Sequence, residues 1–95
     1  MEWQGFEWDD RKAEINLLKH KVSFFEAATV FDDPFVIVEP DLVHSVGESR
    51  ALAIGFSTKE RVLLVVYLDG DERIRLISAR KATHKERRRY ESQFE

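Results

Sequence analysis

The chain has 95 residues, of which 43% are hydrophobic and 35% are charged, and its formal net charge is −3 at pH 7. This length and apolar content indicate a single folded domain over residues 1–95 and exclude a disordered chain. No cysteine is present, which excludes disulfides and thiolate metal sites and suits a reducing compartment. The sequence also lacks an apolar run long enough for a membrane span or a secretory leader. We therefore expect a soluble, cytoplasmic protein without a membrane partner.

The charge is unevenly distributed along the chain. Residues 1–40 carry nine acidic and four basic side chains, a balance of −5, whereas residues 71–95 carry five acidic and eight basic ones, a balance of +3. Eight of the fifteen Lys and Arg residues lie between Arg73 and Arg89. Such a basic segment can attract nucleic acid or an acidic protein, and charge alone does not choose between the two.

The first forty residues predict two short helices joined by a bend. An Asp-Asp pair at positions 9–10 can cap a helix over about residues 11–19. Ser23 and Glu26 match a capping box that begins a second helix, and Pro34 marks its end. The apolar side chains of this second helix share one face: Phe24, Ala27, Ala28 and Phe31. The aromatic segment before the first helix is expected to be a short extended stretch on the core.

Four strands follow the two helices. We expect them at residues 35–38, 50–56, 61–68 and from residue 73 onward, with a polar loop over residues 39–49. The run RVLLVVYL is apolar on both faces and is therefore expected at the centre of the sheet. The shortest strand is bracketed by prolines and is expected at an edge. The Asp-Gly pair between the last two strands predicts a tight hairpin.

A basic helix closes the predicted fold. Thr83 and Glu86 match a second capping box, after which Tyr90 and Phe94 form an apolar pair at i,i+4 spacing. On the second strand the small residues share one face, which leaves room for another element to lie against the sheet: Ala51, Ala53 and Gly55. The predicted fold class is α+β, with two N-terminal helices, a four-stranded, largely antiparallel sheet and a C-terminal helix.

Three spaced motifs carry a resemblance to a known family. WDDRKAEINLLKHKVSFFEAATVF resembles the first half of the BrnT toxin family through the pattern W-D…K…N…K-H-x-V-S-F-x-E-A…V-F. RIRLISARKATHKERRRY is similar to the second half, I-R-x-I-S-A-R-x-A-T…E-R…Y, and the intervening pattern G-x-S…R-x-L-x-V-x-Y is also met. The resemblance covers about residues 6–90. It departs at Lys21, where the family often has Gly.

The resemblance implies a fold, an activity and a partner. BrnT proteins are toxins of bacterial type II toxin–antitoxin modules, with a RelE-like fold and a ribonuclease activity that arrests translation. Their antitoxin, BrnA, is a small DNA-binding protein of the ribbon-helix-helix kind. The complex represses its own operon, so a toxin of this family would reach operator DNA only through its antitoxin. The implied partners are therefore an RNA substrate and a BrnA-like antitoxin.

Cleavage of RNA without a metal uses the substrate's own 2′-hydroxyl as nucleophile, so the enzyme must supply cations at the phosphate and groups that move protons. Arg80, at the end of the I-S-A-R segment, is the first candidate because arginine binds phosphate oxygens in pairs. Arg61, which opens the central strand, is the second, and the resemblance supports both. Two alternatives remain open: Arg80 could pair with a helix carboxylate, and Arg61 could be a solvated turn residue.

Lys19 and His20 stand where the two N-terminal helices meet. Histidine is the natural acid or base near neutral pH, and Lys19 could support the phosphate, although a His at the end of a helix is commonly a cap for its carbonyls. His44 and His84 are weaker candidates, since each is expected to be exposed. With three scattered His, no Cys and no metal-binding motif, we expect no metal site and no cofactor.

Further cations are candidates for binding the RNA backbone: Lys21, Arg75, Lys81, Arg87 and Arg88. The run of three arginines at 87–89 is typical of a solvated helix face. Beside Arg80 it could also attract RNA or dock an acidic antitoxin.

The resemblance therefore implies a metal-independent endoribonuclease toxin that cleaves single-stranded RNA, inhibits translation and is neutralised by a BrnA-like antitoxin. The alternative is a non-catalytic interaction subunit that binds the antitoxin and acts only as a co-repressor. A third possibility is a small RNA- or DNA-binding domain, which would bind nucleic acid in a salt-dependent manner without cutting it.

Overall fold

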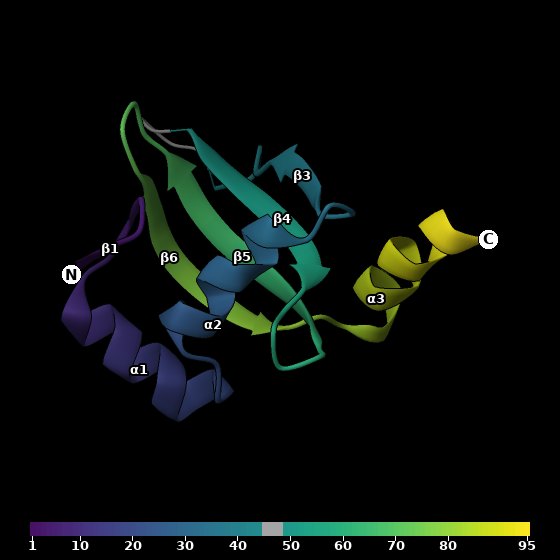
Figure 1. The fold of residues 1–95 in the computed structure, drawn as a ribbon, viewed down its shortest axis with the longest axis horizontal. Helices are drawn as coiled ribbons and strands as arrows, with labels where there is room; N and C mark the ends of the chain where they lie inside the picture. The colour runs from purple at the N-terminus through teal and green to yellow at the C-terminus, as the bar shows by residue number, and fades with distance from the viewer. Residues whose placement is uncertain (45–48) are drawn as a thin grey trace.

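The computed structural model describes residues 1–44 and 49–95. In these ranges, six strands form one mixed sheet in the order β1-β2-β6-β5-β4-β3 (Figure 1). The strands are β1 Glu2–Trp3, β2 Phe6–Glu7, β3 Ile37–Pro40, β4 Arg50–Phe56, β5 Val62–Asp69 and β6 Ile74–Lys81. The helices are α1 Asp10–His20, α2 Phe24–Thr29 and α3 His84–Glu91, with short 3-10 turns at Val30–Asp32 and Ser92–Phe94. None of the described helices is long and apolar enough to cross a membrane.

The predicted α+β class, the two N-terminal helices and the C-terminal helix are confirmed. The predicted count of four strands is wrong, because the first seven residues form a small hairpin that extends the sheet. Gln4 and Gly5 take positive φ values of 48° and 87° and turn the chain between β1 and β2. β2 then pairs in parallel with β6, Phe6 opposite Ile74. This parallel pair joins residues far apart in the sequence, which local patterns do not predict.

Two strand boundaries also differ from the prediction. β3 begins at Ile37 because Asp33 holds the preceding residues in a turn: its Oδ1 accepts the Phe35 N–H at 2.9 Å, and its carbonyl accepts the Val36 N–H at 3.1 Å. The tight Asp-Gly hairpin is instead a four-residue loop, since Asp69 pairs with Ile74. The predicted loop over 39–49 is shorter, with 39–40 in β3, and its positions 45–48 lie outside the described residues.

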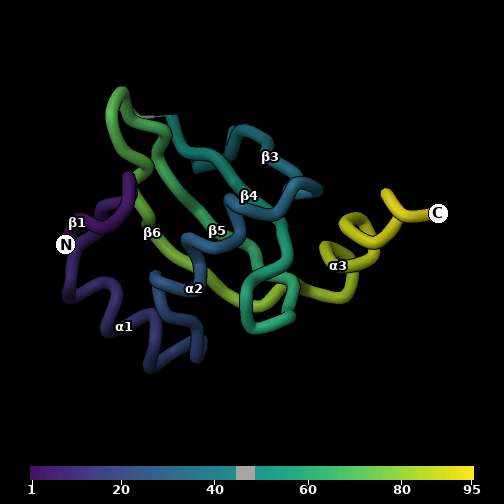
Figure 2. The backbone as a smooth tube through the Cα atoms, viewed as in Figure 1, coloured from purple at the N-terminus to yellow at the C-terminus, as the bar shows by residue number. Residues whose placement is uncertain are grey.

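The core lies mainly between the sheet and the two N-terminal helices. α2 lies across one face of the sheet and α1 runs beside β6 (Figure 2), whereas α3 lies apart from them beside β4. The fully buried side chains on the α2 face come from the α1–α2 bend, from α2 and its following turn, and from the central strands: Val22, Phe24, Ala27, Val30, Ala53, Leu63, Val65, Leu76 and Ala79. A smaller cluster on the opposite face joins Ile54, Leu64 and Tyr90.

The small-residue face of β4 allows this close packing, as predicted. A Cβ added at Gly55 would lie 2.7 Å from Val30 Cγ1 and 3.1 Å from Val36 Cγ2, which is closer than carbon atoms pack. The turn that follows α2 can therefore lie directly on this strand.

Helix α1 is attached by hydrogen bonds more than by apolar packing. Asn16 is its one buried residue. The Asn16 amide nitrogen donates to the carbonyls of Val22 and Ala79, both at 2.9 Å, and its oxygen accepts the Ala79 N–H at 3.1 Å. The Asn16 side chain thus forms hydrogen bonds with backbone groups of both β6 and the α1–α2 bend. These bonds fix the end of α1 beside the end of β6.

Lys21 ends α1 in the left-handed region at φ 60°, where a side chain is strained and glycine is not. We expect Lys21→Gly to raise the free energy of unfolding by about 1 kcal/mol. Lys12 has a helical φ, so the matched control Lys12→Gly should lower the free energy of unfolding by about 1 kcal/mol. Urea denaturation of both variants measures the two effects, and an equal loss in both would contradict the strain at Lys21.

Candidate functional site

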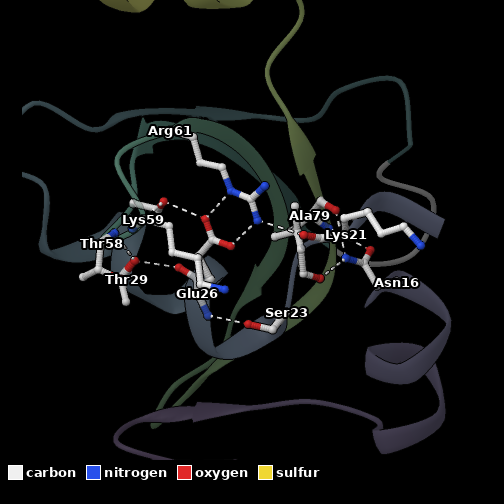
Figure 3. Close-up of polar contacts among 11 residues, drawn as sticks. Asn16, Lys21, Ser23, Glu26, Thr29, Thr58, Lys59, Arg61 and Ala79 are labelled. Atoms are coloured by element: carbon white, nitrogen blue, oxygen red, sulfur yellow. Dashed lines mark hydrogen bonds and ion pairs between the residues drawn. The ribbon is translucent and has the colours of Figure 1, made fainter. Parts of the chain in front are cut away.

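Arg61 stands immediately before β5, and α2 supplies its partner. The Arg61 Nε donates to Glu26 Oε2 at 2.7 Å, and Nη2 donates to Glu26 Oε1 (Figure 3). Nη2 also donates to the main-chain oxygen of Lys21 at 2.8 Å. Glu26 is only 4% exposed, so this two-point ion pair is shielded from water. The guanidinium group is therefore held in one orientation by two different elements.

Glu26 has a further partner on its buried side. The Ser57 hydroxyl donates to Glu26 Oε2 at 2.7 Å, and Ser57 is itself buried. Burial alone would raise the pKa of Glu26, but the hydrogen bonds from Arg61 and Ser57 and the positive charges of Arg61 and Lys59 lower this pKa below 4.5. Glu26 also raises the pKa of Arg61 by its hydrogen bonds. Glu26 is thus a fixed anion whose oxygens are already used.

The capping box predicted at the start of α2 is half formed. The Ser23 hydroxyl accepts the Glu26 N–H at 3.0 Å, as predicted. The Glu26 side chain does not return to the helix start, because it turns to Arg61 and Ser57 instead. The predicted capping role for this carboxylate is therefore wrong, and its position in the folded chain couples α2 to β5.

The end of α1 lies next to this ion pair, because Lys21 accepts the Arg61 hydrogen bond through its carbonyl. Its side-chain ammonium donates back to Leu18 O at 3.0 Å. Lys19 and His20 line a hollow of about 200 Å³ between α1 and β6, with Ser78 on its far wall. Lys21 therefore meets Arg61 through its carbonyl, whereas Lys19 and His20 line a hollow to which Arg61 does not contribute.

Arg80 lies on the other face of the sheet. In the β5–β6 ladder Leu63 is opposite Lys81 and Leu64 is opposite Arg80. Leu63 packs under α2, whereas Leu64 packs with Tyr90 of α3. Side chains alternate along a strand, so Lys81 shares the face of Arg61, and Arg80 points toward α3.

The fork of Arg80 is occupied by a carboxylate of α3. Nη1 and Nη2 donate to the two oxygens of Glu86 at 2.7 and 3.0 Å. These hydrogen bonds raise the pKa of Arg80 and, together with the Thr83 contacts, lower the pKa of Glu86. The same Glu86 completes the predicted capping box with Thr83, which is confirmed. Pairing with a helix carboxylate was the alternative left open for Arg80, and the two candidate arginines do not meet at one phosphate.

The remaining predicted RNA-binding residues lie apart from Arg61. Arg75 is at the start of β6, 3.9 Å from Glu7 and six residues before Lys81, which is about 20 Å along a strand. Arg87 pairs with Glu91 on α3 at 3.8 Å. Arg88 belongs to the same helix and lines a basic hollow of about 390 Å³. The weaker candidates His44 and His84 are both exposed, as predicted.

Sequence reasoning assigned no site role to three residues that organise this region: Asn16, Glu26 and Ser57. Each is a polar side chain that is nearly fully buried, at 5%, 4% and 3% exposure. Asn16 and Glu26 are both positions of the N…K-H-x-V-S-F-x-E-A motif, which was the available signal. Within the described ranges, no three His, Asp or Glu side chains are grouped closely enough to hold a metal ion.

Comparison with known proteins identifies the family of the chain. A family model described as "Ribonuclease toxin, BrnT, of type II toxin-antitoxin system" matches residues 8–86. The chain belongs to the BrnT family. It is therefore a ribonuclease toxin of a type II toxin–antitoxin system, and an antitoxin is its partner. The matched segment of this BrnT protein contains both arginine–glutamate pairs and ends before Arg87 and Arg88.

A solved structure shows the same BrnT fold. The chain is similar to the ribonuclease toxin BrnT of Brucella abortus, whose crystal structure was determined at 1.1 Å resolution. The two are 24% identical, with a TM-score of 0.66, and the match covers 83% of this chain and 96% of that chain. At this identity the likeness establishes the fold alone. No curated protein matches this BrnT chain.

The lowered pKa of Glu26 predicts a contribution to acid sensitivity. A carboxylate with a lowered folded pKa stabilises the protein above its unfolded pKa, and this stability is lost as pH falls through the folded value. We expect the free energy of unfolding to fall below about pH 4.5 and to fall less steeply in Glu26→Gln. Denaturant titrations between pH 3 and pH 7 measure the slopes. Glu14→Gln, at an exposed carboxylate of α1, is the control and should keep the wild-type slope.

Proposed function

We propose that this BrnT toxin cleaves RNA by attack of the 2′-hydroxyl on the adjacent phosphate, with Arg61 as the residue that binds that phosphate. The observation that carries this proposal is the preset orientation of the guanidinium group. Glu26 and the Lys21 carbonyl engage Nε and Nη2, while Nη1 makes no hydrogen bond to any described residue. The side chain is 26% exposed, so this nitrogen can reach a ligand.

The surroundings of Arg61 suit an anionic substrate. Lys21 contacts it through the backbone, Lys81 lies on the same sheet face, and Lys19 is two residues from the contact. A phosphorane carries more negative charge than the phosphate from which it forms, so fixed cations stabilise the transition state more than the ground state. A guanidinium group that is already oriented requires little reorganisation at the moment of reaction.

Two proton transfers accompany the bond changes. The 2′-oxygen loses its proton as it bonds to phosphorus, and the 5′-oxygen gains one as its bond to phosphorus breaks, which leaves a cyclic phosphate and a 5′-hydroxyl. His20 is the proposed proton carrier, since it lies beside Lys21 at the end of α1 and an imidazole ring can both accept and donate a proton. Glu26 is the positioning residue for Arg61, because its oxygens are used in hydrogen bonds. These groups need no metal ion, so we propose a metal-independent endoribonuclease.

Arg80 is proposed to bind RNA away from the cleaved bond. Its two terminal nitrogens bind Glu86, so they can grip a phosphate together only if Glu86 releases them. On the α3 face it would lie with Arg87 and Arg88, where it could bind a distant part of the RNA strand. Arg75, at the far end of β6, would be a more remote contact.

We further propose that RNA cleavage inhibits translation in the cytoplasm and that a BrnA-like ribbon-helix-helix antitoxin neutralises the toxin. Operator DNA would then be bound through the antitoxin. A second candidate function is a non-catalytic co-repressor subunit. The observation that favours it is that Arg61 and Arg80 each have a carboxylate partner within the chain, so both are satisfied without a substrate.

The decisive comparison is between the two arginines. We expect Arg61→Ala to lower the rate of RNA cleavage by about 100-fold or more, a loss typical of a removed charge-stabilising group. Arg61→Lys keeps the positive charge but not the planar guanidinium group, so its cleavage rate should lie between those of wild type and Arg61→Ala. Arg80→Ala should retain most of the activity. Gel assays of labelled single-stranded RNA with chelator present measure all three rates.

Thermal melting of each variant controls for folding. A loss of cleavage in Arg80→Ala but not in Arg61→Ala would move the site to the α3 face. If folded wild type leaves RNA intact at high protein excess, with and without ribosomes, the co-repressor function replaces the ribonuclease proposal.

A further inference from the structure

An apolar groove separates α1 from α2 on the side away from β6. Its volume is about 250 Å³. The lining combines three aromatic side chains with two apolar residues and one acid of α1: Trp8, Phe24, Phe25, Ala13, Leu17 and Glu14. Trp8 and Phe24 form a buried floor, at 4% and 1% exposure, whereas Leu17 and Phe25 stand at the walls with 48% and 45% of their surface exposed.

The groove walls are open although they belong to rigid elements. Phe25 is held edge-on by Trp3 and Trp8, with ring centres 5.1 and 5.0 Å apart. Leu18 extends the apolar surface along α1 and is 68% exposed. The helix itself is attached through Asn16, so its exposed leucines are not needed to fold it. A preformed apolar groove with rigid aromatic walls is the kind of surface into which a partner helix or segment places its apolar anchors.

The charges around the groove indicate the chemistry of its partner. Glu14 is the acidic side chain at the lip, and it forms no ion pair with any described residue. An occupant with basic side chains beside its apolar anchors would complement this rim. By contrast, two of the three arginines on α3 already have acidic partners, Arg87 with Glu91 and Arg89 with Glu39. The α3 surface is therefore less suited to an acidic antitoxin segment than its sequence suggests.

We propose that this groove is the docking site for an apolar, basic segment of the antitoxin. The inference rests on the proposed function in one respect, since it takes the partner to be the BrnA-like antitoxin. The groove and the site share the α1–α2 bend: Ser23 lines the groove, and Lys21 two residues earlier holds Arg61. An antitoxin seated in the groove lies beside the cations of the site and would hinder the approach of RNA.

Titration calorimetry of the purified toxin with the BrnA-like antitoxin encoded in the same operon tests this inference. We expect Leu17→Glu and Glu14→Lys each to weaken binding at least tenfold, because the first places a charge in the apolar wall and the second reverses the charge of the lip. Val38→Glu is the matched control, since Val38 is 53% exposed on the edge strand β3 and lies outside the groove. It should bind as wild type.

Melting curves and RNA cleavage by each free variant separate the possible failures. If wild type fails to cleave RNA but Leu17→Glu still loses antitoxin binding selectively, the ribonuclease proposal fails and the docking site stands. If Leu17→Glu does not fold, the antitoxin affinity of Glu14→Lys alone tests the docking site. Wild-type affinity in the groove variants, equal weakening in Val38→Glu, or no binding by wild type overturns the inference. Light scattering tests whether the groove binds a second copy of the toxin. That is the case if the free protein is a dimer and Leu17→Glu dissociates the dimer without loss of antitoxin binding.

Discussion

The ion pair between Arg61 and Glu26 is the interaction on which the candidate site depends. It joins the start of the central strand to α2, and the carbonyl of Lys21 adds the end of α1 to the same guanidinium group. A buried carboxylate is costly unless it is paired, and here Arg61 and Ser57 supply the partners. The same hydrogen bonds that stabilise Glu26 orient the arginine. The stability of the fold and the proposed function therefore depend on the same contact.

Asn16 holds the end of α1, which carries further cations, in place against the sheet. Its amide binds the backbone of β6 and of the α1–α2 bend, so Lys19 and His20 are fixed relative to the sheet although most of α1 is exposed. A helix attached in this way can keep apolar side chains such as Leu17 free for a partner. In this account a few buried polar contacts position the site and leave the outer face of α1 for binding.

Local patterns in the sequence predicted most of the fold. The Thr83–Glu86 capping box, the limits of β4 and the central place of β5 follow from short-range spacing and apolar content, and they were found. The parallel pairing of β2 with β6 and the bond from Glu26 to Arg61 span long stretches of sequence, and no local rule links such positions. Glu26 also matches the local pattern of a capping box with Ser23, but in the folded chain its side chain binds Arg61 and Ser57 instead. The faces of Arg61 and Arg80 depended on strand register, which the motif alone does not give.

A double-mutant cycle tests whether Glu26 acts on RNA cleavage through Arg61. Cleavage rates are measured for wild type, Glu26→Gln, Arg61→Ala and the double variant, with melting curves to confirm folding. We expect Glu26→Gln to lower the cleavage rate when Arg61 is present and to have no further effect when Arg61 is already replaced by alanine. Independent, multiplicative losses in the double variant would contradict it, because Glu26 would then contribute to cleavage by a route that does not involve Arg61.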